Sequence, residues 1–451
     1  MVNVKLPDEV LFIISTLENN GYCTFVVGSC VRDLVIGKEP EDWNIYTQAL
    51  PEKITECFAG QQSIETMIQH GTVTLLLNRE LYEITSFRMC NIDTGNRNRC
   101  SVALKCDLTQ DLSRRDFTVN AIAYHPEKGL IDSFGGISDI KNRVIRCIGD
   151  ANVRFREDAL LIMRAVRLYS ELGFCIESIT ATAMYANCHF LNDITSERIL
   201  YELNHMLVGN YVGDALADFA PIIGAIIPEI IPMINFVQNT PYHDLDVWSH
   251  TVKSISCIPS VLTLRLTMLL HDIAKPLCFT ESIDGVGHYY RHPQKSADMA
   301  KEILTRLRYD NSTIKNVVKL ILYHDMIIEP NKKHIERWIS RVGVNTLSQL
   351  IEVKRADVLA QSEAFREERL NVLDSAEMQI DSLIRQNRGF SLNNLAVDGN
   401  DMIEVGVAQG IQVGKVLNCL LEMVIDEEVK NDRDLLMEKA RELYMCSLRE
   451  I

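Results

Sequence analysis

A glycine turn near the N-terminus is the first candidate for chemistry in this chain. Gly28 follows directly after residues 22–27, whose β-branched and aromatic side chains predict a strand. A glycine followed by the small Ser29 lets backbone N–H groups approach phosphate oxygens. Arg32 follows, where a helix would point its N-terminus at the same anion. The pattern predicts a phosphate-binding strand, turn and helix; the alternative is the same unit with ordinary surface side chains.

Asp42 and Asn44 stand two positions apart on the segment that follows the turn. Side chains alternate along a strand, so an extended segment would place both on one face. Two carboxylates there would hold Mg²⁺ against a triphosphate, but Asn44 supplies a neutral oxygen instead of a charge. We expect Asp42 and Asn44 to bind Mg²⁺ in a catalytic role, with Glu83 on a later alternating strand as the acid that compensates.

A second group of metal-binding residue types lies in the C-terminal half. His250 comes first, His271 and Asp272 end an apolar run, and Asp357 follows. Neighbouring residues on one helix lie about 100° apart, so His271 and Asp272 can reach one ion that the distant residues complete. We expect the four to bind a divalent transition metal. Two more histidines are candidates for a second metal or for a substrate phosphate: His292 and His324.

Further short motifs follow the turn in a characteristic order. They occupy residues 70–73 (HGTV), 82–88 (YEITSFR), 111–121 (DLSRRDFTVNA), 132–139 (DSFGGISD), 154–167 (from RFRED) and 196–199 (SERI). Their order and wording resemble the class II tRNA nucleotidyltransferases, which are the CCA-adding enzymes and their bacterial poly(A) polymerase relatives. The His, His-Asp, Asp order resembles the HD-superfamily metal phosphohydrolases, a domain that several bacterial CCA-adding enzymes carry.

The resemblance implies an α+β fold in which a polymerase β-like nucleotidyltransferase head is followed by largely helical parts. We expect the head over residues 1–145, a helical neck over 146–238, the HD domain over 239–370 and a helical tail over 371–451. The implied reaction is the addition of CMP and AMP, taken from CTP and ATP with Mg²⁺, to the 3′ end of tRNA or of another RNA.

The resemblance also implies a nucleotide site. Its expected members are Gly28, Ser29, Arg32, Arg88, Arg114, Arg115, Asp116, Asn120, Asp158, Arg164 and Arg167. In the family an Asp and an Arg of the motif Glu-Asp-x-x-Arg read the Watson–Crick edge of the incoming base. Here Asp158 is present, but Leu161 occupies the arginine position. Leucine donates no hydrogen bond, and a bond to a charged group is worth about 1.5–3 kcal/mol, so we expect weakened selection between CTP and ATP.

Two other functions stay open. One is an HD-type phosphohydrolase acting on phosphoesters or 2′,3′-cyclic phosphates at RNA ends, with a weak or inactive head. That alternative follows from Asn44, because the loss of one charge from a metal clamp removes much of the transition-state stabilisation in phosphoryl transfer. The other is a tRNA-binding protein without enzymatic activity.

Composition agrees with a large globular protein. The chain has 451 residues, 47% hydrophobic and 24% charged, with a net charge of −15 that argues against a nonspecific nucleic-acid binder. A locally basic segment, 141–167, coincides with one of the motifs. The apolar stretch 219–237 contains three prolines and predicts short buried helices, so we expect no membrane partner. Thirteen cysteines without a Cys-x-x-Cys spacing predict reduced thiols and a cytoplasmic location.

Overall fold

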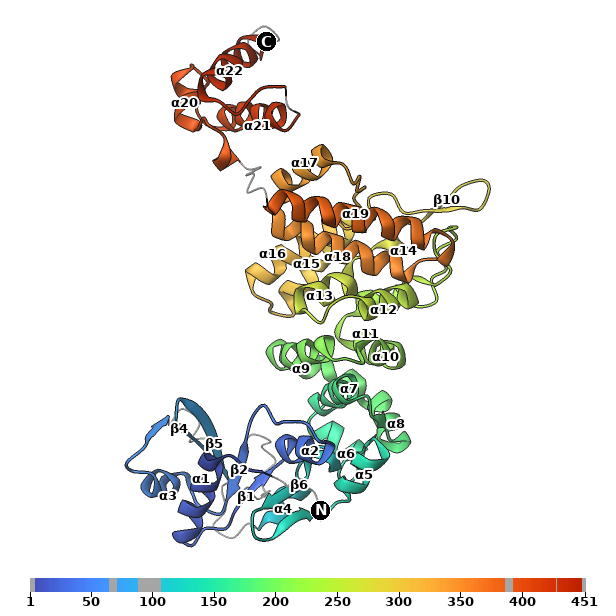
Figure 1. Cartoon of the computed structure of the whole chain (residues 1–451). Coiled ribbons are helices and arrows are strands. Elements are labelled where there is room, and N and C mark those ends of the chain that lie inside the picture. The colour runs from blue at the N-terminus through green and yellow to red at the C-terminus, as the bar shows by residue number, and fades with distance from the viewer. Residues whose placement is uncertain (1–4, 65–70, 88–106, 386–391, 427, 448–451) are drawn as a thin grey trace. The chain divides into compact units, whose positions relative to one another are not determined.

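The computed structural model describes residues 5–64, 71–87, 107–385, 392–426 and 428–447. It divides into two compact units (Figure 1). The first comprises residues 1–211 with 218–226, and the second comprises 212–217 with 227–451. Each unit holds one of the two groups of candidate residues. The finer division into four domains stays a prediction.

A mixed seven-stranded sheet forms the centre of the first part of unit 1, with the order β3-β4-β5-β2-β1-β6-β7. Only β2 and β5 pair in parallel among these strands. The strands are β1 Thr24–Val27, β2 Asn44–Thr47, β3 Gln62–Ile64, β4 Thr72–Leu77, β5 Glu80–Ser86, β6 Ile122–His125 and β7 Gly129–Asp132. Strand β1 is buried along its whole length, as expected for an apolar strand in the middle of a sheet.

Helices of unit 1 cover this sheet and continue beyond it. They are α1 Asp8–Asn19, α2 Ser29–Ile36, α3 Pro51–Cys57, α4 Leu108–Ser113, η2 Thr118–Asn120, α5 Gly136–Asn142, α6 Ala151–Glu157, α7 Leu160–Leu172, α8 Ser178–Asn187, η3 Cys188–Asp193, α9 Ser196–Val208 and α11 Ala220–Ile226. A short parallel pair joins β8 Val144–Ile145 to β9 Cys175–Ile176. Helix α2 packs against β1 and β6, which fixes the turn at its start to the middle of the sheet. Helix α10, Val212–Asp218, spans the division between the units.

Unit 2 is almost entirely helical. Its elements are η4 Pro228–Met233, α12 Val247–Cys257, α13 Leu262–Leu270, α14 Lys275–Cys278, β10 Thr280–Glu281, β11 Gly287–His288, α15 His292–Arg306, α16 Asn311–Tyr323, α17 Lys332–Val342, α18 Val344–Ala360, η5 Glu363–Phe365, α19 Arg366–Arg385, η6 Leu392–Asn394, α20 Gly399–Glu404, α21 Ile411–Ile425 and α22 Arg433–Ser447. Helix α18 packs against α12, α13, α16 and α19, so it links the helices that carry the candidate metal ligands.

The last helices of unit 2 have an apolar core of their own, centred on Met402, Leu420 and Leu436. Gly406 and Gly410 lie outside α20 and α21 with positive φ, whereas Gly414 lies inside α21. The stretch 219–237 forms short helices as expected, with Pro221 in the first turn of α11, Pro228 at the start of η4 and Pro232 inside η4. Within the described residues, no helix is both long enough and apolar enough to cross a bilayer.

Candidate nucleotide site and metal centre

Gly28 forms a strained turn between β1 and α2. Its φ is +101°, a conformation that side-chain-bearing residues rarely adopt. A Cβ atom at this position would lie 2.9 Å from Nη1 of Arg115. The guanidinium of Arg115 also stacks 4.3 Å above the ring of Tyr46 on β2. The turn therefore needs glycine for its backbone angle, and a side chain at this position would also have to displace the guanidinium of Arg115.

The segment predicted to carry both Mg²⁺ ligands on one strand is only partly a strand. Strand β2 begins at Asn44, and Asp42 lies in an exposed bend before it. Pairing of β2 with β1 starts only after the bend that contains Asp42. The alternation of side chains along a strand therefore does not place Asp42 and Asn44 on one face. Asn44 donates from Nδ2 to Oγ of Ser29 at 3.4 Å, which places it beside the glycine turn. It also pairs in register with Glu83 of the parallel strand β5.

Polar contacts connect the turn to the helices that follow the sheet. Arg32 donates to Oδ1 of Asn120 at 2.8 Å, and Asn120 donates to Oδ1 of Asp116 at 3.2 Å. The other carboxylate oxygen of Asp116 accepts from Arg164 at 3.1 Å. Burial alone would raise the pKa of Asp116, but the Arg164 charge and the hydrogen bonds to its carboxylate lower it overall. Four of the expected nucleotide-site residues thus form one connected network.

Arg164 and Arg167 already have a buried partner that sequence reasoning missed. Glu202 on α9 is 2% exposed and accepts from Nε of Arg164 at 3.2 Å and from Nε of Arg167 at 2.6 Å. Arg167 also pairs with Glu171, one turn along α7. Their charges are therefore largely used to hold α7 against α9. No local pattern signals Glu202, because its partners lie on a different helix.

The remaining expected residues have these positions. Arg114 ends α4, and its carbonyl and that of Arg115 accept from Arg154 at 2.7 and 3.1 Å. Asp158 follows α6 and pairs with Arg198 at 2.8 Å, a second residue that sequence reasoning did not assign. Leu161 is buried in α7. Arg88 lies outside the described residues.

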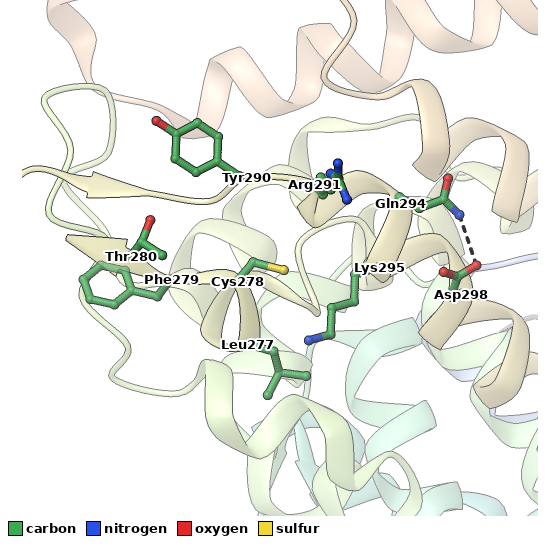
Figure 2. A pocket seen from close by; sticks show the side chains of 9 residues that line it. All are labelled: Leu277, Cys278, Phe279, Thr280, Tyr290, Arg291, Gln294, Lys295 and Asp298. Carbon is green, nitrogen blue, oxygen red and sulfur yellow. Dashed lines mark hydrogen bonds between the residues drawn. The ribbon is translucent and has the colours of Figure 1, made fainter. Parts of the chain in front are cut away.

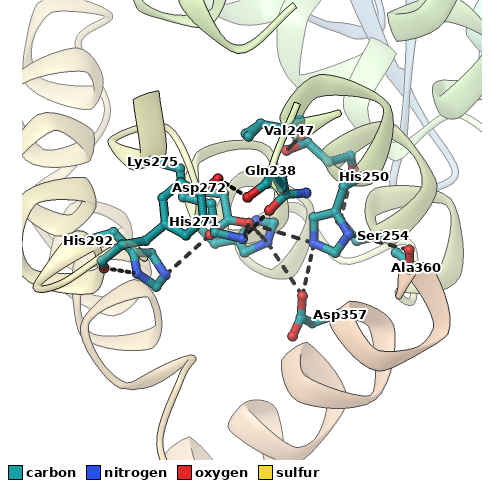
Figure 3. A network of polar contacts seen from close by, with 12 residues as sticks. Gln238, Val247, His250, Ser254, His271, Asp272, Lys275, His292, Asp357 and Ala360 are labelled. Atoms are coloured by element: carbon teal, nitrogen blue, oxygen red, sulfur yellow. Dashed lines mark hydrogen bonds and ion pairs between the residues drawn. The ribbon is translucent and has the colours of Figure 1, made fainter. Parts of the chain in front are cut away.

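In unit 2 the four expected metal ligands meet in one buried cluster (Figure 3). His250 lies on α12, His271 caps the end of α13, Asp272 follows it, and Asp357 lies on α18. Nε2 of His250 lies 2.9 Å from Oδ1 of Asp357 and 3.6 Å from Oδ2 of Asp272. Nε2 of His271 lies 3.2 Å from the same Asp272 oxygen. Helices distant in sequence thus converge on Asp272.

The two additional histidines lie on the other side of Asp272. Nε2 of His292 lies 3.4 Å from Oδ1 of Asp272, and Nε2 of His324 lies 3.7 Å from it. The two ring nitrogens lie 3.3 Å from each other. Asp272 therefore presents one oxygen to each pair of histidines, an arrangement that matches two neighbouring metal positions sharing one carboxylate.

The protonation pattern of the cluster fits metal binding. The Nδ1 atom of each histidine faces a backbone carbonyl, and a carbonyl only accepts, so Nδ1 carries the proton and Nε2 keeps its lone pair for the cluster. The pairs are His250 with Ala360, His271 with Met268, His292 with Tyr289 and His324 with Ile321. Nε2 of His271 and both carboxylate oxygens of Asp272 are buried, and the polar atoms nearest to the Asp272 oxygens are the histidine Nε2 atoms and Nζ of Lys275. These atoms suit a divalent metal.

Two residues outside the expected set also contact the cluster. Lys275, one turn after Asp272, lies 2.6 Å from Oδ2 of Asp272 and donates to Oε1 of Gln238 at 2.9 Å. Burial raises the pKa of Asp272, but His271 and Lys275 hold it well below its usual value. The spacing of Lys275 on the same helical face could have indicated it from sequence, whereas nothing local indicates Gln238.

The described residues of unit 2 line a cavity on each of two faces of interest. One, of about 490 Å³, has Asp357 in its wall, so it reaches the cluster. The other, of about 440 Å³, lies between residues 277–280 and 290–298 (Figure 2). Its wall includes Arg291 and Lys295 but no member of the metal cluster. Of these two cavities of the described residues, the first borders an expected metal ligand.

Family profiles match three parts of the chain. The poly A polymerase head domain matches residues 24–146, the "Probable RNA and SrmB- binding site of polymerase A" matches residues 173–219, and tRNA nucleotidyltransferase domain 2 matches residues 292–440. The first match spans all seven strands of the sheet, so it contains the glycine turn and Asn44. Helix α1 lies before it.

Similar proteins cover the whole chain. The CCA-adding enzyme of Lactobacillus helveticus is 30% identical over 97% of this chain and 98% of its own length, and that of Pediococcus pentosaceus is 29% identical over the same shares. The crystal structure of the Bacillus stearothermophilus CCA-adding enzyme in complex with CTP has a TM-score of 0.75 at 25% identity, over 99% of this chain and 100% of that one. The chain therefore belongs to the CCA-adding enzyme family of tRNA nucleotidyltransferases.

Proposed function

We propose that this protein adds CMP and AMP to the 3′ end of tRNA, using CTP and ATP with Mg²⁺. The observation that carries the proposal is the glycine turn of unit 1, where Gly28 meets Arg115 and Asn44 meets Ser29 within a head shared with CCA-adding enzymes. Relatives in complex with CTP, with ATP and, for the Thermotoga maritima enzyme, with tRNA support the same substrates.

Each residue would contribute a different part of the reaction. Backbone N–H groups at the start of α2, together with Arg115, suit the phosphates of the nucleotide. Asp42, Asn44 and Glu83 are the candidate ligands of Mg²⁺, which when bound neutralises charge on the phosphates. Asp158, half-exposed and paired with Arg198, is the candidate contact to the base. Arg164 and Arg167 would position these groups through Asp116 and Glu202.

Two substitutions would make the transfer slow and poorly selective. Asn44 provides no charge to the metal, and loss of one preorganised electrostatic contact costs about 10²–10³ in rate. Leu161 is buried and offers no donor to a base. We therefore expect measurable but weak transfer and reduced discrimination between nucleotides.

The direct test is extension of labelled tRNA that lacks its terminal CCA, with CTP, ATP and Mg²⁺. The wild type should lengthen the tRNA, and Asp42→Ala should stop the reaction. Glu39→Ala, which removes another exposed acid from the same loop, is the matched control and should leave the rate within about twofold of the wild type. Absence of any extension by the wild type would remove the proposal.

The metal cluster of unit 2 favours a second function, a metal-dependent phosphohydrolase of HD type. Its support is the convergence of four Nε2 atoms and two carboxylates in one buried site. Opening of 2′,3′-cyclic AMP and release of phosphate should require Ni²⁺, Mn²⁺ or Mg²⁺ and should be lost in Asp272→Ala. Asp284→Ala, an exposed acid of the same unit, should remain active. Inactivity with all three metals would reject this function, and tRNA binding without either activity would leave a binding protein.

A further inference from the structure

Asp158 and Arg198 form an exposed ion pair in unit 1. Nη2 of Arg198 donates to Oδ2 of Asp158 at 2.8 Å, and Oδ1 of the same carboxylate accepts from the backbone N–H of Leu160 at 3.2 Å. The side chains of Asp158 and Arg198 are 37% and 48% exposed. The carboxylate is therefore held in one orientation just before α7, while both charged groups keep much of their surface free of protein contacts.

Buried contacts fix the helix that carries Arg198. Arg198 lies in the first turn of α9, and Glu202 follows one turn later. Glu202 accepts from Arg164 and Arg167 of α7, the helix that begins two residues after Asp158. The buried carboxylate of Glu202 thus holds α9 against α7, and the packing of these two helices brings Arg198 to Asp158.

The same pair of helices is connected to the glycine turn. Arg164 also donates to one oxygen of Asp116, whose other oxygen accepts from Asn120. Asn120 in turn accepts from Arg32 of α2, the helix that starts at the turn. The helices that carry Asp158 and Arg198 are therefore joined by a continuous series of polar contacts to the expected phosphate position.

Arg198 differs from the other arginines of this network. Arg164 and Arg167 are 33% and 18% exposed, and each is bonded to a buried carboxylate. Leu161, three residues after Asp158, is buried and offers no donor. The bond from Arg198 to Asp158 uses one of the five N–H groups that a guanidinium carries. Arg198 therefore places further donors beside an exposed carboxylate.

An acceptor and a donor side by side match the hydrogen-bonding edge of two bases. Cytosine and adenine both present an amino group, which donates, next to a ring nitrogen that accepts, whereas uracil and guanine present a carbonyl oxygen next to a ring N–H. An ionised carboxylate only accepts and a guanidinium only donates. Once the triphosphate fixes the orientation of the base, Asp158 and Arg198 can bond to cytosine or adenine and meet the opposite pattern in uracil or guanine.

We propose that Arg198 is a specificity-determining residue, whose guanidinium bonds to the ring nitrogen of cytosine or adenine while Asp158 accepts from the amino group. This inference rests on the transfer function proposed for unit 1 and adds to it the source of the donor that Leu161 does not supply. The pair separates amino-bearing bases from carbonyl-bearing ones without separating cytosine from adenine. Weak discrimination between CTP and ATP is therefore compatible with rejection of UTP and GTP.

Equilibrium binding of CTP and of UTP to the full chain tests Arg198, because these two nucleotides differ only at this edge of the base. Mg²⁺ is present and tRNA is left out, so that no transfer occurs. The wild type should bind CTP at least tenfold more tightly than UTP, as expected for one hydrogen bond to a charged group. Arg198→Met should weaken CTP to the level of UTP and leave UTP within about twofold. ATP and GTP should behave like CTP and UTP.

Two further variants separate base reading from charge and from folding. Lys141→Met removes the same charge from an exposed position of α5 and should keep the ratio of CTP to UTP affinity. Arg198→Gln keeps a polar side chain in the first turn of α9. Its amide carries both a donor and an acceptor, so it should lower the ratio by strengthening UTP as well as weakening CTP. A ratio of affinities does not depend on the fraction of each variant that is folded.

The outcomes that contradict the inference differ from those that contradict the proposed function. If the wild type prefers CTP and Arg198→Met keeps that preference, Arg198 does not read the base although the transfer function stands. Equal weakening of CTP and UTP by Arg198→Met would show that Arg198 acts through its charge on the phosphates, and equal binding of both by the wild type would show that the pair reads nothing. If the wild type binds no nucleotide, the proposed transfer function fails and this inference fails with it.

Discussion

At the scale of single residues, the turn at Gly28 shows why the first motif needs its exact composition. Its backbone has a φ of +101°, and a Cβ at this position would lie 2.9 Å from Nη1 of Arg115. The sequence indicated the glycine from its place after an apolar strand. It could not indicate the contact with Arg115, because the two residues are brought together only by the sheet. Asn44 and Glu83 are neighbours for the same reason.

Gly28→Ala should destabilise unit 1 and abolish nucleotide binding. The positive φ and the 2.9 Å contact both oppose a methyl group, and a strained backbone position costs about 1–3 kcal/mol. Denaturant unfolding and CTP binding measure the two effects. Gly60→Ala is the control, since a Cβ at Gly60 meets nothing within 4 Å. Equal stability of the two variants would contradict the packing described for the turn.

Asp116→Asn should destabilise unit 1 in a pH-dependent way. The folded pKa of Asp116 is lowered, so its carboxylate contributes stability that is complete above about pH 5 and disappears as the pH falls through the folded pKa. The variant should lose about 1–3 kcal/mol at pH 7, and the difference from wild type should shrink toward pH 3. Calorimetry across this range measures it, with the exposed Asp244→Asn as control. A difference independent of pH would refute the ionic role of Asp116.

At the scale of elements, helix ends and helix pairs do most of the positioning. His271 and His324 lie at the C-terminal ends of α13 and α16, and His292 opens α15. The apolar periodicity of these segments predicts the helices, and the His-Asp pair predicts the cluster. The bend at Asp42 was not predicted, because the motif fixes residue types and not the residue at which strand pairing begins.

Glu202→Gln should weaken the interaction between α7 and α9. The carboxylate is buried between two arginines, and removal of one partner from a buried pair costs about 3–5 kcal/mol; we expect the lower end, because Arg164 is one-third exposed. Hydrogen exchange in peptides covering α7 and α9 should rise relative to wild type. Glu197→Gln, an exposed acid at the start of α9, should not change it. Unchanged protection in Glu202→Gln would show that apolar packing alone joins the helices.

At the scale of the whole molecule, the two groups of candidate residues belong to different compact units. Sequence motifs located both groups, since their residue types are diagnostic even without a structure. Glu202 and Arg198 meet their partners through contacts between segments distant in sequence, whereas Lys275 lies only three residues from Asp272; none of the three was predicted. Motifs thus predicted candidate groups, and the fold shows which residues contact those groups.

In the absence of Mg²⁺ and nucleotide, removal of the metal bound by the histidine cluster should affect only unit 2. All cluster ligands lie in that unit, and a metal at 100 times its dissociation constant adds about 2.7 kcal/mol to the folded state. A chelator should therefore lower the unfolding transition of unit 2 and leave that of unit 1 in place. In Asp272→Ala the chelator should have no effect. A shift of the unit 1 transition alone would contradict the assignment of the metal centre.

The most direct measurement of the central claim is the single-turnover rate of CMP addition to tRNA lacking CCA, compared between the wild type and Asn44→Asp. Asn44 lies beside Ser29 and Glu83, so a restored carboxylate should strengthen Mg²⁺ binding at the phosphates and raise the rate about a hundredfold. Asn371→Asp, an exposed position on α19, provides the same charge change elsewhere and should leave the rate unaltered. Equal rates for wild type and Asn44→Asp, or no addition by either, would contradict the account of a weakened but genuine nucleotidyltransferase.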